Sequence, residues 1–160
     1  MILIRPVEPN DMDAVIALGD IGARETRYKN QNYDPDKIRR QSEVYFRDGR
    51  SKYICLVAER GGELQGILFG SVDEYWFTQA RSANMIAWYV ARKARGSSMA
   101  AKLLLAFRRW AENRQASELT LSITSGVNTE KTGRFLRRMG FRPCGENFYQ
   151  ALGAPALNSD

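Results

Sequence analysis

The chain has 160 residues, of which 44% are hydrophobic and 26% charged, a balance typical of one folded domain and too apolar for a disordered chain. Its 24 Lys and Arg against 18 Asp and Glu give a net charge of +6, which suits an anionic partner. The absence of histidine excludes His-based triads and His-ligated zinc, and no apolar run is long enough to span a membrane. With an N-terminus unlike a secretory signal, these features predict a cytoplasmic protein.

The first half of the chain predicts one strand, two helices and a hairpin. Residues 2–5 form a short apolar strand, and the helical spacing of apolar residues over 11–24 predicts a helix. A second helix is expected from Pro35 to about Arg47, since proline is favoured in a first turn. Two apolar runs on either side of Gly61-Gly62, residues 53–58 and 64–72, predict an antiparallel hairpin.

The second half predicts a βαβ unit, a further helix and a final hairpin. Residues 85–91 are apolar on both faces, which is typical of a strand in the middle of a sheet. A long amphipathic helix and an alternating strand at 119–124 follow, and this connection requires two parallel strands. A helix over 129–139 ends before Gly140. Two short apolar runs then close a hairpin, the first over residues 141–144 and the second over residues 148–152.

These elements predict a single α/β (α+β) domain over residues 1–152, with a C-terminal tail at 153–160. Its central sheet is mixed and has about seven strands, flanked by four helices. The two cysteines, Cys55 and Cys144, each lie in a short apolar run, which predicts neither a disulfide framework nor a metal cluster. Cys144 is interpreted as a small buried hydrophobe.

A basic, glycine-containing turn follows the strand at 85–91 and opens the long helix. The first turn of a helix carries unpaired N–H groups and the positive end of the helix dipole. Small residues there let a phosphate reach the backbone, and Arg92, Lys93 and Arg95 surround that point with positive charge. The turn predicts a pyrophosphate site. The alternative interpretation is an ordinary helix start, which would have the same short sequence pattern. Its residues are Arg95, Gly96, Ser97, Ser98, Met99 and Ala100.

Two segments resemble the signature motifs of the GNAT acyltransferase family. The turn from Arg95 to Ala100 is similar to motif A, Gln/Arg-x-x-Gly-x-Gly/Ala, with Ser98 where glycine is usual. Residues 128–141 are similar to motif B, an asparagine after a strand followed by a helix that ends in Gly-Phe. The element order matches too, so the resemblance covers nearly the whole chain and implies the GNAT fold. A weaker likeness within residues 18–38 is to GNAT proteins often carried by bacteriophages.

The resemblance implies direct transfer of an acetyl group from acetyl-CoA to an amine, without an acyl-enzyme and without a metal. Backbone groups at Val90 would hold the pantetheine and polarise the thioester carbonyl. Asn128 would bond the pantetheine, Phe135 would lie near it, and the basic turn would take the pyrophosphate. The implied cofactor-binding residues are Val90, Arg92, Arg95, Gly96, Ser97, Ser98, Met99, Ala100, Asn128 and Phe135.

Proton transfer needs one group to take a proton from the amine and another to protonate the departing thiolate. Many family members use a tyrosine in the motif B helix, but alignment on Gly140-Phe141 puts Leu136 at that position. Tyr149 is the alternative acid, with a buried core tyrosine as the competing interpretation. Glu25 is the candidate base, with a solvated helix-end carboxylate as its competitor. Asp73 and Glu74 are further candidates by position.

Three functions follow from these observations. The first is an N-acetyltransferase that acts on a protein lysine, a protein N-terminus or a small amine. The second is a non-catalytic GNAT scaffold that binds acyl-CoA and engages another protein as a regulatory or phage effector factor, and the missing tyrosine favours it. The third, nucleic-acid binding through basic helices, is disfavoured because the nearby aromatic residues fall on predicted apolar faces. A membrane partner is not expected, and a homodimer is left open.

Overall fold

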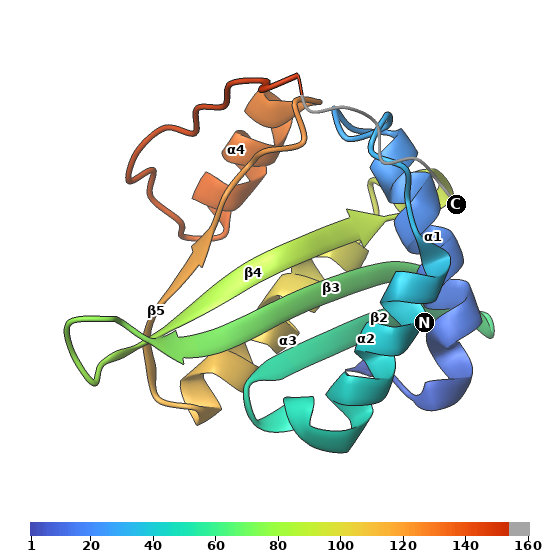
Figure 1. Ribbon diagram of the computed structural model, residues 1–160, viewed down its shortest axis with the longest axis horizontal. Coiled ribbons are helices and arrows are strands. Elements are labelled where there is room, and N and C mark those ends of the chain that lie inside the picture. The colour runs from blue at the N-terminus through green and yellow to red at the C-terminus, as the bar shows by residue number, and fades with distance from the viewer. Residues whose placement is uncertain (154–160) are drawn as a thin grey trace.

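The computed structural model describes residues 1–153, so the predicted tail lies outside the described residues from residue 154 onward. Five strands form one sheet in the order β1-β2-β3-β4-β5, with four α-helices around it (Figure 1). The first four strands are antiparallel to their neighbours, whereas β5 runs parallel to β4, which confirms the mixed sheet. The strands are β1 (Ile2–Pro6), β2 (Tyr53–Arg60), β3 (Glu63–Glu74), β4 (Arg81–Val90) and β5 (Ala116–Leu121). The helices are α1 (Met12–Arg24), α2 (Pro35–Asp48), α3 (Met99–Asn113) and α4 (Thr129–Arg138).

The helices begin and pack where their sequence predicts. At the start of α2, the Asp34 carboxylate accepts a hydrogen bond from the Lys37 N–H at 2.9 Å, and Pro35 occupies the first helical position. α1 buries one apolar stripe against the sheet, and α3 buries another against the opposite face. None of the described helices is long and apolar enough to cross a membrane.

The main core lies between α3 and the sheet and is centred on Phe107. This ring is fully buried and stacks on Trp110 at a centroid distance of 5.7 Å. It packs directly on the backbone of β3 at Gly70, where an added Cβ would collide with the ring. Glycine at position 70 therefore lets the largest core side chain approach the sheet.

One extra residue divides β4 into two halves. The register against β3 shifts by one residue at Ile86, which forms a β-bulge and is 55% exposed. β5 pairs with β4 only before the bulge, and this register ends with Met85 opposite Leu121. We call residues 81–85 the paired half of β4 and residues 87–90 the open half (Figure 1). The open half has a neighbouring strand on its β3 edge alone among the described residues.

The bulge also decides which side chains face which helix. Before it, Ala83 and Met85 pack against the core under α3, and after it Trp88 and Val90 do the same. Tyr89 faces the other side, where its ring lies against α1 at Gly22. The prediction that residues 85–91 are buried on both faces is wrong, because none of them is fully buried and both Ile86 and Ala87 are exposed. The extra residue at Ile86 has no position in the pleat.

The final hairpin is absent, so the sheet has five strands in place of about seven. Residues 142–153 form no strand, and Phe148 and Leu152 are each 87% exposed. Pro143 cannot donate a ladder hydrogen bond, and these apolar side chains find no face to cover. β5 also ends earlier than predicted, at Leu121. Cys144 is exposed, which corrects its interpretation as a buried hydrophobe.

Candidate functional site

The open half of β4 directs backbone groups away from β3. The N–H of Ala91, just after β4, donates to the Gln65 carbonyl of β3 at 2.8 Å. Successive residues of a strand present their backbone groups to opposite edges. The backbone N–H and carbonyl of Val90 therefore point to the edge of β4 where β5 no longer pairs. Its carbonyl accepts a hydrogen bond from Arg95 Nε at 3.0 Å, which agrees with this orientation. A ligand that enters beside β4 would therefore meet backbone groups at Val90.

The turn between β4 and α3 presents free N–H groups, as the sequence predicts. Gly96 has a φ of +85°, a conformation that glycine adopts without strain. Ser97 fixes the turn, since its hydroxyl donates to the Ala94 carbonyl at 2.6 Å and accepts from the Met99 N–H at 3.3 Å. Within the described residues, no hydrogen bond uses the N–H of Gly96, Ser98 or Ala100. The buried Met99 side chain anchors the helix start to the core.

Two arginines of this turn share one carboxylate. Glu25, just after α1, accepts hydrogen bonds from Arg92 Nε at 2.7 Å and from Arg95 Nη2 at 2.5 Å. Burial alone would raise the pKa of the Glu25 carboxyl, but Arg95 and Arg92 together outweigh burial and lower it. Glu25 is therefore a charged ion-pair partner here, and its predicted role as a base stays a prediction.

The α4 side of the site carries aromatic and polar side chains but no hydroxyl acid at the motif B position. Phe135 meets Trp88 of the open half at a centroid distance of 5.7 Å. Leu136 is buried on a different side of α4, where it lines a pocket of about 410 Å³ against residues 141–147. Asn128 adopts a left-handed conformation with φ +51° before α4, and its side chain makes no hydrogen bond within the described residues. Phe135 is thus an α4 residue that contacts the open half of β4.

Arg27 joins three segments at the other end of the site. Its backbone N–H donates to the Ser125 carbonyl at 2.8 Å, and its Nε donates to the Thr124 carbonyl at 2.6 Å. Its guanidinium lies 4.4 Å from the ring centroids of both Tyr28 and Tyr149. Tyr149 is 73% exposed, so its interpretation as a buried core residue is wrong. The sequence gives no signal for this contact, because Arg27 and Thr124 are 97 positions apart.

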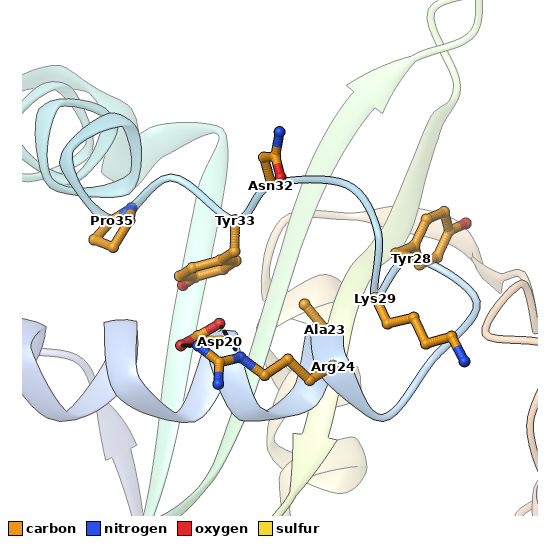
Figure 2. A pocket seen from close by; sticks show the side chains of 8 residues that line it. All are labelled: Asp20, Ala23, Arg24, Tyr28, Lys29, Asn32, Tyr33 and Pro35. Carbon is orange, nitrogen blue, oxygen red and sulfur yellow. Dashed lines mark hydrogen bonds and ion pairs between the residues drawn. The ribbon is translucent and has the colours of Figure 1, made fainter. Parts of the chain in front are cut away.

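A pocket of about 390 Å³ lies between the end of α1 and the loop before α2 (Figure 2). Asp20 and Arg24 pair across one helical turn at 2.7 Å, and Tyr33 lies opposite them on the loop. The pocket is lined by Asp20, Ala23, Arg24, Tyr28, Lys29, Asn32, Tyr33 and Pro35. Among the described residues, no group of three or more acidic or cysteine side chains gathers where it could hold a metal ion.

The structure thus defines a mixed α/β domain in which a strand opens beside an anion-attracting helix start. Residues 20–141, well over half of the chain, match the family model described as the acetyltransferase (GNAT) family. The protein belongs to the GNAT acetyltransferase family. A sequence comparison with curated proteins finds no match.

Solved structures with the same fold include proteins with diverse names. A transcriptional regulator from Bacillus halodurans C-125 has a TM-score of 0.79 and 18% identity, with 95% of this chain and 100% of that chain covered. Glucosamine-6-phosphate N-acetyltransferase from Arabidopsis thaliana has a TM-score of 0.76 and 13% identity, with coverages of 95% and 99%. Ribosomal-protein-alanine N-acetyltransferase from Brucella melitensis biovar Abortus 2308 has a TM-score of 0.71 and 19% identity, with coverages of 96% and 100%. At these identities the likeness shows the fold alone.

Proposed function

We propose that this protein transfers an acetyl group from acetyl-CoA to an amine. The observation that carries the proposal is the open half of β4, which leads directly into a turn with free N–H groups and two arginines. A pyrophosphate needs donors of this kind, and a thioester needs a backbone donor close by. Both requirements are met within residues 90–100.

The cofactor-binding residues divide into two groups by position. At the helix start, Arg92, Arg95 and the turn from Gly96 to Ala100 would hold the pyrophosphate, with Ser97 shaping the turn and Met99 anchoring it. Along the strand, Val90 would hold the pantetheine, with Asn128 and Phe135 on the α4 side. The residues present therefore fit the CoA group that the family uses.

Acetyl-CoA supplies the activated acetyl group, and the protein's own part is to orient the reactants and move two protons. The backbone at Val90 would stabilise the oxyanion that develops when the amine attacks, and the C–S bond then breaks. Glu25 can take the amine's proton only after Arg92 and Arg95 have turned to a bound pyrophosphate, because their ion pairs lower its pKa. Tyr149 remains the predicted acid, and its exposure beside Arg27 leaves its hydroxyl accessible.

The acceptor is proposed to approach from the segment between α1 and α2, which includes the pocket shown in Figure 2. The structural neighbours include a ribosomal-protein-alanine N-acetyltransferase and a glucosamine-6-phosphate N-acetyltransferase. Both acceptor classes, a protein amine and a small amine, therefore belong in the test. The cytoplasmic location, the phage origin and a homodimer stay predictions.

A calorimetric titration and a turnover assay test the proposal in sequence. Acetyl-CoA and free CoA should each give a saturable heat, and CoA release should exceed the acceptor-free background for at least one amine. The panel comprises a peptide with an N-terminal alanine, a lysine peptide and glucosamine 6-phosphate. Absence of binding at millimolar concentration would contradict the cofactor assignment.

A non-catalytic acyl-CoA-binding scaffold is the second candidate function. It is favoured by one observation, that neither Phe135 nor Leu136 offers a hydroxyl where many family members have a tyrosine. Saturable CoA binding with no turnover over a broad panel of amines would favour this function over catalysis.

A further inference from the structure

The short segment from Glu25 to Arg27 connects the two sides of the open half of β4. Glu25 binds Arg92 and Arg95, which follow directly after β4. Two residues later, Arg27 binds the carbonyls of Thr124 and Ser125, which follow β5. We call residues 25–27 the strap, because they tie the ends of both strands to the end of α1.

The β4 end of the strap uses the groups that the proposed cofactor needs. The Glu25 side chain is 18% exposed, and both of its oxygens are occupied, one by each arginine. The same two guanidinium groups belong to the turn that carries the free N–H groups. Since a pyrophosphate and a carboxylate are both anions, they compete for Arg92 and Arg95.

The β5 end of the strap uses none of these groups. Arg27 donates to two main-chain carbonyls and to the Tyr28 hydroxyl at 2.9 Å, and Tyr149 stacks on its guanidinium. Gly126 lies against the Arg27 side chain, where an added Cβ would be 3.3 Å from the Arg27 Cβ. None of these contacts involves the arginines that the proposed cofactor needs.

We propose that Glu25 is an internal anion of the cofactor site, which CoA displaces on binding, and that this displacement releases the strap at its β4 end. The inference rests on the proposed function and adds a coupling between the cofactor turn and the loop that borders the acceptor. Once Glu25 is released from the two arginines, the segment over residues 26–34 gains freedom on the acceptor side. Cofactor binding thereby prepares the loop for the acceptor.

The coupling is reciprocal, because any interaction that CoA must break lowers its affinity by the same free energy. Substituting Glu25→Gln removes the competing charge and should tighten the binding of free CoA about three- to tenfold. Glu63→Gln is the matched control. Glu63 is paired with Lys93 of the same turn at 2.5 Å, so this substitution removes the same charge without touching the strap.

Free CoA is the probe, and hydrogen–deuterium exchange with calorimetry is the measurement on the full chain. In the unsubstituted protein, CoA should speed amide exchange over residues 26–34 while exchange at residues 96–101 slows. In Glu25→Gln, exchange over 26–34 should be fast from the start, with no further change on adding CoA. Glu63→Gln should respond as the unsubstituted protein does.

The outcomes separate the two proposals. If free CoA gives no heat with the unsubstituted protein, the proposed function fails and the strap mechanism fails with it. If CoA binds but exchange over 26–34 is unchanged or slower, the strap mechanism alone is overturned. It is also overturned if Glu25→Gln binds CoA no more tightly than Glu63→Gln.

Discussion

The two halves of β4 belong to one strand but differ in role, since one is part of the core and the other borders the proposed ligand site. The paired half lies between β3 and β5, and Ala83 in its middle is fully buried. Within residues 1–153 the open half has one neighbouring strand, and its other edge leads to the arginines and N–H groups of the turn. The comparison teaches that a single strand can fix the fold at one end and offer backbone groups to a ligand at the other.

The largest expected effect is a loss of stability in the core that packs against the paired half of β4. Phe107→Ala removes a fully buried ring that packs on Gly70, and should lower the free energy of unfolding by about 3–5 kcal/mol in urea denaturation. Leu105→Ala, on the same helix but 45% exposed, should change it by no more than about 0.5 kcal/mol. The affinity of folded Phe107→Ala for CoA should change less than about twofold. A parallel loss of affinity would show that the two halves are not separable.

Next in size is a change to the turn after the open half. Gly96→Val forces a β-branched residue into φ +85° and crowds the site of the pyrophosphate, so affinity for acetyl-CoA should fall about tenfold or more. Gly61→Val is the control, because Gly61 also has positive φ (+61°) and open space around it, but lies in the β2–β3 turn. Both variants should lose similar stability, and calorimetry should find weak binding for Gly96→Val only.

The smallest effect concerns the ion pairs that hold the open half to α1. The pKa of Glu25 is lowered in the folded protein, so its ion pairs stabilise the fold above the unfolded carboxyl pKa of about 4.3. Glu25→Gln should therefore reduce the free energy of unfolding by up to about 1 kcal/mol at pH 7. The difference should shrink as pH falls through the folded pKa.

Glu130→Gln provides the control for that pH series. Glu130 is 93% exposed and lies 3.9 Å from Arg134, so Glu130→Gln should change stability less than Glu25→Gln does at pH 7. A difference between Glu25→Gln and the unsubstituted protein that does not shrink as pH falls below the unfolded carboxyl pKa would contradict the role given to the ion pairs.

The sequence predicts the local parts of this structure well. Pro35 marks the start of α2, Gly61-Gly62 the β2–β3 turn, and Gly140 the end of α4, because each residue has a backbone preference that acts locally. The turn at Gly96 was found for the same reason, with its positive φ and free N–H groups. The family was identified from the turn and the motif B segment, and the match to residues 20–141 confirms it.

The features that the sequence missed depend on distant partners. The ion pairs of Glu25 join residues 67 and 70 positions apart, and no local pattern reveals them. The final hairpin was predicted from two short apolar runs, but a strand also needs an edge to pair with and a face to bury. The bulge was missed because Ile86 is apolar like its neighbours, and only the register against β3 distinguishes it.

The extra residue in β4 shifts the alternation of side chains between the two faces of the sheet by one position. Side chains alternate with a period of two, yet odd-numbered residues face α3 before Ile86 and even-numbered residues face it afterwards. If Ile86 instead occupied a regular position in the pleat, Trp88 and Val90 would face α1 and Tyr89 would face α3. One inserted residue therefore sets which residues of the chain form the wall beside α4, a choice that no substitution at those positions could make.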